Sequence, residues 1–237
     1  MNNIKTKQKN MPSDSTSLLD DEATFRSVER TSNLRANIFL FESMVVLSVY
    51  VYLIYGWKLC CSAQSHLLAA FGAIYMIRLN IMSRWLLQRE LGIEELTVVM
   101  LLWLPAIMGS YIFLAKNVSD VGLVVASIMY TLGSYLNTYS ELQRKIWKRD
   151  PDHKGRCYTL GLFSWSRNIN YFGDSLLFAG WAVATGNLVN WWTPIVMGLS
   201  FYFFHIPDKE KYLKTRYAQD WPAYQTQTPY AFVPYLC

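Results

Sequence analysis

Residues 37–57 read NIFLFESMVVLSVYVYLIYGW, an apolar run with one charged side chain, Glu42. A helix needs about 20 mostly apolar residues to cross the hydrocarbon core of a bilayer. Five further stretches meet or approach this requirement: 67–87, 96–115, 121–139, 173–189 and 191–206. Of the 237 residues, 52% are hydrophobic and 16% are charged, a composition typical of membrane proteins. The sequence therefore predicts an all-α integral membrane protein, a bundle of about six transmembrane helices.

The positive charges lie on one side of these predicted spans. Short loops on the cytoplasmic side of a membrane carry an excess of Lys and Arg. If the N-terminus is cytoplasmic, all 22 Lys and Arg residues except Lys58, Lys116 and Arg78 fall in cytoplasmic segments. We therefore predict that both termini are cytoplasmic. Because this topology accounts for the net charge of +5, we expect no nucleic-acid partner.

The composition changes near residue 25. Residues 1–25 are polar and hold few aromatic side chains, which predicts a disordered cytoplasmic tail. Residues 26–237 show no internal repeat, so we expect a single transmembrane domain. Within it, 140–172 is a polar, basic loop, and the aromatic tail 207–237 is expected to pack back against the inner face or the membrane interface. The four Cys and three His residues lack metal-ligand spacing, and no metal site is predicted.

Polar residues inside the predicted spans are candidates for function, because they are costly in a bilayer. Arg78 lies mid-span, Tyr75 precedes it on the same helical face, and Glu42 lies near the inner end of the first span. Together they could supply charge and a proton to a reaction. Alternatively, Arg78 pairs with a buried carboxylate such as Glu42 to hold helices together, or extends to the membrane interface.

A second group of polar residues lies at the inner end of the span 121–139. Asn137 and Glu141 share one helical face that leads to the basic loop. The loop segment 143–156 contains Arg144, Lys145, Lys148, Arg149, Lys154 and Arg156. Such a cluster favours binding of a phosphate group. A plain cytoplasmic loop attracted to anionic lipid headgroups has the same composition.

A third group stands at the start of the span 173–189 and just before it. It consists of Arg167, Asn170, Tyr171 and Asp174. Asn170 and Asp174 could simply cap the helix that begins there. Capping does not explain Arg167 and Tyr171.

These groups carry a resemblance to a known family. Segment 131–237 resembles the C-terminal domain of the steroid 5-alpha-reductase family and its sterol reductase relatives. The family pattern of Arg, Asn-Tyr, Gly and an acid is matched by Arg167, Asn170, Tyr171, Gly173 and Asp174. Sterol reductases also have a stretch of Gln, basic and aromatic residues that ends in Asp-Pro, and residues 143–151 match it. Their C-terminal pattern of Tyr, Trp, Tyr and Pro-Tyr is matched by Tyr217, Trp221, Tyr224 and Pro234-Tyr235.

The resemblance implies a helical membrane enzyme that binds NADPH from the cytoplasmic side. It would deliver hydride to a carbon-carbon double bond of a steroid, sterol or other lipid from the bilayer. The implied nucleotide-binding residues are Asn137, Glu141, Arg156, Asn170, Tyr171, Asp174 and Tyr224, with Arg144 and Arg167 as phosphate contacts. Tyr75 and Glu42 are the candidate proton donors: Tyr75 has the spacing of the family's catalytic tyrosine before an arginine, whereas Glu42 is a candidate only as an acid in an early span. The family's usual location is the endoplasmic reticulum.

Two alternatives remain open. A membrane methyltransferase of the isoprenylcysteine or phospholipid type shares an Arg-His-Pro-x-Tyr core and would use S-adenosylmethionine. Asn168 and Ile169 stand in place of that His-Pro pair, which favours the reductase. The third reading is a non-catalytic sterol-binding membrane scaffold, against which the matching cofactor residues argue.

Overall fold

The structure is a computed structural model that describes residues 15–58, 62–86 and 98–236. Its N-terminal half contains α1 (Ser15–Leu53), which continues into a short π-helical turn at Ile54–Lys58, and α2 (Ala63–Ile81), which continues into another at Met82–Leu86. A π-helical segment at Val98–Trp103 leads into α4 (Leu104–Phe113). The side chain of Ser62 caps α2 by accepting a hydrogen bond from the backbone N–H of Ser65.

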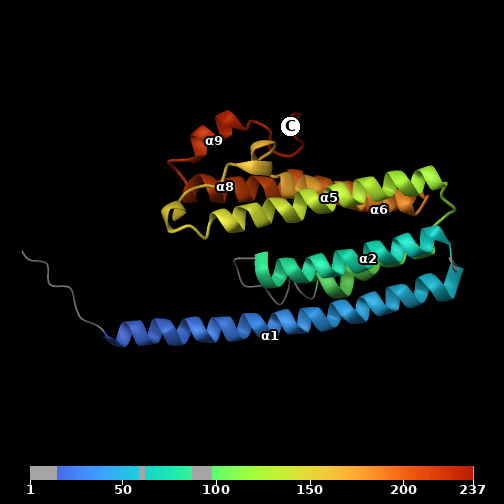
Figure 1. The fold of residues 1–237 in the computed structure, drawn as a ribbon, viewed down its shortest axis with the longest axis horizontal. Helices are drawn as coiled ribbons and strands as arrows, with labels where there is room; N and C mark the ends of the chain where they lie inside the picture. Colours follow the sequence, from blue (N-terminus) through green and yellow to red (C-terminus); the bar gives the residue numbers. More distant parts are fainter. Residues whose placement is uncertain (1–14, 59–61, 87–97, 237) are drawn as a thin grey trace, which may run out of the picture.

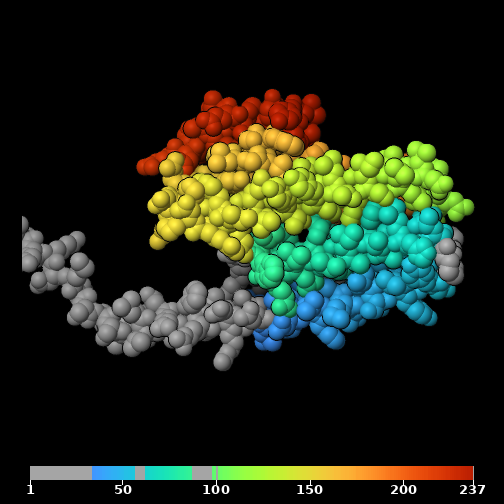
Figure 2. Space-filling model, viewed as in Figure 1, coloured from blue at the N-terminus to red at the C-terminus, as the bar shows by residue number. Residues whose placement is uncertain are grey.

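The C-terminal half contains six further elements of note. They are α5 (Asp120–Trp147), α6 (Ile169–Ala184), α7 (Trp192–Ser200), a π-helical turn at Phe201–His205, α8 (Ile206–Arg216) and α9 (Trp221–Gln227). Short 3-10 turns lie at Pro151–His153, Gly161–Ser164 and Leu188–Trp191. Figure 1 shows the arrangement in layers, with α1 outermost, then α2, then α5 with α6, and α8 with α9 on the far side. In Figure 2, α2 is packed between α1 and α5.

The described residues contain no β-strand, and the prediction of an all-α membrane protein is confirmed. Three helical segments are long and apolar enough to cross a bilayer: Leu34–Gly56, Ala63–Leu86 and Asp120–Trp147. The predicted spans 96–115, 173–189 and 191–206 correspond to shorter helices, α4, α6 and α7. Large apolar side chains such as Phe41, Tyr52 and Ile128 face outward, as expected for a surface in contact with lipid.

The N-terminal tail differs in part from the prediction. Residues 1–14 lie outside the described residues, but α1 begins at Ser15 and so includes 15–25, which the composition assigned to a disordered tail. That stretch contains Leu, Ala and Glu, which favour helix formation even where no apolar face is present.

Glycines set the distance between α5 and α6. A Cβ atom added to Gly133 would lie 2.5 Å from the carbonyl oxygen of Gly173, and one added to Gly180 would lie 2.6 Å from the backbone nitrogen of Tyr130. Without Cβ atoms the two backbones come into direct contact, as small residues allow in membrane helix pairs. This contact fixes the register of the polar residues at the inner ends of α5 and α6.

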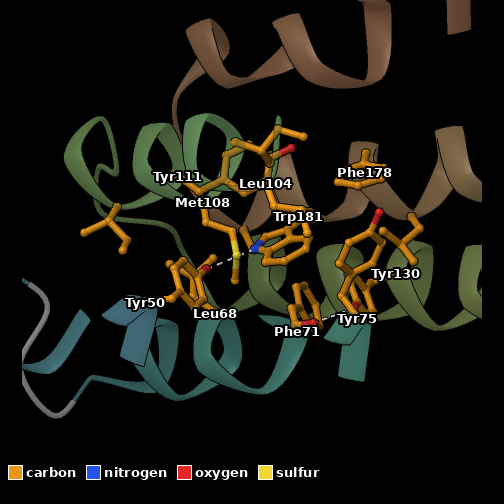
Figure 3. Close-up of a cluster of buried hydrophobic side chains, with 14 of the residues drawn as sticks. Tyr50, Leu68, Phe71, Tyr75, Leu104, Met108, Tyr111, Tyr130, Phe178 and Trp181 are labelled. Atoms are coloured by element: carbon orange, nitrogen blue, oxygen red, sulfur yellow. Dashed lines mark hydrogen bonds between the residues drawn. The ribbon is translucent and has the colours of Figure 1, made fainter. Parts of the chain in front are cut away.

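An aromatic cluster fills the centre of the bundle (Figure 3). Trp181 is fully buried, and its indole N–H donates to the hydroxyl of Tyr50 over 3.3 Å. The ring of Phe71 stacks on that of Tyr130 with centroids 3.8 Å apart. Tyr75 lies at the side of this cluster nearest the polar site and packs edge-to-face against Phe178 and Trp181. Large buried aromatic surfaces of this kind hold α1, α2, α5 and α6 together.

Candidate functional site

Arg78 is the centre of a polar network that joins three helices. It lies on α2, is 8% exposed, and points toward α5 and α6. Its Nε donates to Thr138 Oγ1 over 2.8 Å, and its Nη2 donates to Asn137 Oδ1 over 2.6 Å and pairs with Asp174 Oδ1 at 3.2 Å. Of the two structural alternatives for Arg78, the structure therefore shows pairing with a carboxylate, and the partner is the partly buried Asp174 and not Glu42.

Asn137 extends the network to the start of α6. Its side-chain amide donates to the backbone carbonyl of Asn170 over 3.0 Å. The side chain of Asn170 accepts a hydrogen bond from Lys209 over 3.3 Å, while Asp174 accepts from Arg78. The N-cap of α6 is Asn168, which makes no capping hydrogen bond. Asn170 and Asp174 therefore serve the network, and the capping interpretation does not describe them.

A second charged group lies beside this network, at the inner end of α5. Glu141 is 5% exposed and forms an ion pair with Arg144. The guanidinium of Arg144 lies 5.7 Å from the ring centroid of Phe163, and the ammonium of Lys209 lies 5.8 Å from the same centroid. Lys209 also lies 4.7 Å from the ring centroid of Tyr171. Two cations thus face one aromatic ring next to the predicted nucleotide-binding residues.

The electrostatic state of Lys209 follows from this position. Burial and then the charge of Arg144 lower the pKa of the Lys209 amine to about 8, against smaller opposing effects of Glu141 and Glu210. Sequence reasoning counted Lys209 only among the positive charges of the tail. The sequence feature that could have indicated the burial of Lys209 is the aromatic composition of 207–237, which predicted that the tail packs back on the protein.

Arg167 connects the start of α6 to the tail. It is 8% exposed, and its guanidinium forms two hydrogen bonds with Glu210, at 2.7 and 3.2 Å, and one with the carbonyl of Thr228 at 2.7 Å. The neighbouring Asn168 donates to the carbonyl of Ala231 over 2.8 Å. The predicted phosphate contact at Arg167 is thus occupied by groups of the protein itself, which hold the aromatic tail in place.

Tyr224 supports the loop that carries Phe163. The Tyr224 hydroxyl donates to the carbonyl of Phe163 over 2.8 Å, and its burial raises the pKa of this hydroxyl above the ordinary value. Arg156 lies farther out: its side chain is 63% exposed and pairs with Asp220 at 3.0 Å. The hydrogen bonds from Arg156 and from the backbone of Cys157 lower the pKa of the Asp220 carboxyl.

The two predicted proton donors lie in different surroundings. Tyr75 lies one helical turn from Arg78, whose Cζ is 5.8 Å from the tyrosine ring centroid, and Arg78 in turn pairs with Asp174. Glu42 lies on α1, and its Oε2 is buried without a hydrogen-bond partner among the described residues. Within that part of the chain no hydrogen bond or ion pair connects Glu42 with Arg78 or Tyr75. The structure therefore brings Tyr75, but not Glu42, to the polar network.

A cavity of about 480 Å³ lies on the other face of α2, between α1 and α2. Its walls are mostly apolar and include Leu40, Leu47 and Ile77, with Asn80 and Arg84 as polar members. Its volume is within the range of small-molecule pockets. Among the described residues, no group of three or more His, Cys, Asp and Glu side chains could hold a metal ion.

Comparisons with known proteins place this site in a family. A family model described as "Protein of unknown function (DUF1295)" matches residues 93–228. A probable O-methyltransferase from Ustilaginoidea virens is 34% identical over 74 residues, which are 31% of this chain and 26% of that protein. The Delta(14)-sterol reductase of Saccharomyces cerevisiae is 32% identical over 82 residues, or 32% of this chain and 18% of the reductase.

The Delta(14)-sterol reductase of Candida albicans is 24% identical over 152 residues, which are 56% of this chain and 33% of that protein. The chain thus spans a third or less of the length of these curated relatives. The family model covers more than half of the chain and includes all of the site residues on α5, α6, α8 and α9. The chain therefore belongs to the DUF1295 family, within the steroid 5-alpha-reductase and sterol reductase superfamily that its C-terminal motifs indicated.

Proposed function

We propose that the protein is a membrane-embedded reductase that uses NADPH to reduce a carbon-carbon double bond in a steroid, sterol or other lipid. The observation that carries this proposal is the network of Arg78, Asn137, Asn170 and Asp174, which brings charged and amide groups from three helices together inside a membrane protein. Such groups are costly within a bilayer and mark functional sites. Two relatives of the chain are Delta(14)-sterol reductases, which supports the same reaction class.

The residues at the site suit a dinucleotide. NADPH carries several negative charges, and Arg144 and Lys209 present two cations at the inner end of α5. The nicotinamide carboxamide needs both a donor and an acceptor. The Nη1 atom of Arg78 is a buried donor that has no partner among the described residues, and Asp174 is an acceptor beside it. An unpartnered buried donor is costly, and a ligand oxygen there removes that cost.

When bound, NADPH would supply the hydride, and the protein must then provide a proton and exclude water. Tyr75 is the proposed proton donor because its ring lies 5.8 Å from Arg78, which pairs with Asp174, at the edge of the aromatic cluster. The rings of Phe178 and Trp181 cover Tyr75 and keep water from this side of the site. Glu42 is the second candidate, with the weaker support described above.

The proposed orientation places both termini and the nucleotide-binding end in the cytoplasm. The distribution of Lys and Arg supports this, since Arg144, Lys148 and Lys209 all lie at the same end of the bundle as the basic loop. We propose the endoplasmic reticulum as the location, because it is the usual home of the superfamily. The lipid substrate would enter from the bilayer.

The first test is the thermal stability of the detergent-purified protein with NADPH, NADH and S-adenosylmethionine. A ligand that binds only the folded state raises the apparent stability, by about 2.7 kcal/mol at a hundred times its Kd. Stabilisation by NADPH alone supports the reductase and justifies a screen of sterols and lipid enones. Stabilisation by none of the three favours the sterol-binding scaffold.

One observation favours the methyltransferase as a second candidate. The relative with 34% identity over 74 residues is described as a probable O-methyltransferase. Its match covers 26% of that protein, and Asn168 and Ile169 interrupt the methyltransferase core in this chain. Stabilisation by S-adenosylmethionine without any response to NADPH would replace the reductase proposal with methyl transfer.

A further inference from the structure

Lys209 lies where four parts of the protein converge. It belongs to α8, and its ammonium lies 3.3 Å from Asn170 Oδ1 and 4.7 Å from the Tyr171 ring centroid, both on α6. The Phe163 ring, in the loop before α6, is 5.8 Å away. The guanidinium of Arg144, on α5, lies 5.7 Å from the centroid of the same ring. Lys209 is therefore a cation next to the proposed cofactor site.

The charge of Lys209 is not matched by an ion pair in the described part of the chain. The two carboxylates that raise the pKa of Lys209 are engaged elsewhere: Glu141 pairs with Arg144, and Glu210 pairs with Arg167 through two hydrogen bonds. The polar partner of Lys209 is the neutral amide of Asn170. A half-buried cation without an anion, with a second cation beside the same aromatic ring, favours binding of an anionic group that both cations can contact.

We propose that Lys209 and Arg144 hold one phosphate group of the bound nucleotide, and that tight binding requires Lys209 in its ammonium form. This inference rests on the proposed function, because it assigns a role to a residue of the same site. It adds a regulatory property that the reductase reaction alone does not require, namely a nucleotide affinity that depends on pH in the mildly alkaline range.

The sign of this dependence follows from the groups around Lys209. Burial and Arg144 lower the pKa of Lys209 to about 8, while Glu141 on α5, Glu210 on α8 and Cys157 in the loop oppose that effect. The neighbours on α6, Asn170 and Tyr171, add no charge at neutral pH. At pH 7 the free protein therefore holds Lys209 mostly as ammonium, and at pH 9 mostly as neutral amine.

A bound phosphate stabilises the ammonium, so nucleotide binding takes up a proton near pH 8. With one linked proton, the Kd for NADPH should weaken about tenfold between pH 7 and pH 9. The 2′-phosphate is fully ionised across this range and does not contribute to the change.

The test is the Kd of NADPH at pH 7 and pH 9 for the wild type and for Lys209→Arg, measured by calorimetry on the detergent-solubilised protein. Arginine stays charged at both pH values, so the variant should bind with nearly the same Kd at each. The matched control is Lys214→Met, which removes an exposed lysine from the same helix and should keep the tenfold change of the wild type.

A second measurement is independent of any variant. At pH 8, calorimetry of the wild type in buffers of different ionisation enthalpy should show uptake of about half a proton per NADPH bound. Binding without proton uptake, or an undiminished pH dependence in Lys209→Arg, overturns this inference and leaves the reductase proposal intact. A protein that does not bind NADPH even at pH 7 overturns the reductase proposal, and this inference with it.

Discussion

The Arg78–Asp174 pair allows a sharp test of how the site is held together. Asp174→Ala removes the carboxylate and leaves Arg78 with only the neutral side chains of Asn137 and Thr138. Breaking a buried ion pair in this way costs about 3–5 kcal/mol. The Asp174 side chain is 23% exposed, so water reaches it, and we expect a cost near the lower end, about 3 kcal/mol. For a protein of this size that corresponds to a fall in Tm of roughly 6–12 °C.

The assay is thermal unfolding in detergent of Asp174→Ala, Arg78→Met and the double variant. Either single change leaves one charged partner without its counterion. The double variant should therefore lose at least ~2 kcal/mol less free energy of unfolding than the two single variants lose together. Arg84→Met is the matched control. Arg84 lies farther along the same helical segment and hydrogen-bonds to Ala36 and Asn37 at the surface, so its loss should cost less than ~1 kcal/mol. Simple additivity of the Arg78 and Asp174 costs would refute the pairing argument.

Three further predictions follow from the fold and the site. Gly180→Ala places a methyl group 2.6 Å from the backbone of Tyr130 and should destabilise the protein by about 2 kcal/mol or more in thermal unfolding. In the control Gly109→Ala the added methyl group lies 3.8 Å from its nearest neighbour, so stability should change little. Tyr75→Phe should leave NADPH affinity unchanged and abolish most turnover of an accepted lipid; normal turnover would exclude Tyr75 as the proton donor. The lowered pKa of Asp220 gives a stability contribution that is present above the unfolded-state carboxyl pKa of about 4 and disappears as the pH falls through the lower folded-state pKa. Asp220→Asn should remove this contribution. The variant should therefore lose more free energy of unfolding, relative to the wild type, at pH 7 than at pH 3.

The sequence identified many of the residues that meet at the site, but not all of their partners. Asn137, Asn170 and Asp174 were predicted together from motif order, and the structure joins Asn137 and Asp174 to Arg78 directly and Asn170 through Asn137. The choice between Glu42 and Asp174 as the partner of Arg78 depends on how α2 is rotated against its neighbours. Hydrophobic periodicity does not fix that rotation in a helix that is apolar on all sides.

The partners of the cations near the site could not be predicted from the sequence either. In the sequence, Arg144 and Arg167 look alike, because each lies close to a predicted span. In the structure, Arg167 is hydrogen-bonded to Glu210 and to a carbonyl of the tail, whereas Arg144 lies at the edge of the site. Lys209 lies in a charged stretch that reads as a solvated helix face. Its burial results from the packing of α8 against α6, a tertiary contact that local sequence does not encode.

The glycine contacts between α5 and α6 divide the molecule into a part that tolerates little change and a part that tolerates more. Backbone touches backbone across these helices, so the spacing between Asn137 and Asn170 is set by main-chain atoms and any added side chain disturbs it. Between α1 and α2 there is instead a cavity of about 480 Å³ whose walls are side chains. Substitutions such as Leu47 or Ile77 to smaller residues reshape that space without touching the polar network. Evolution can therefore diversify the half of such a protein that lines the cavity while the half that carries the polar network stays unchanged.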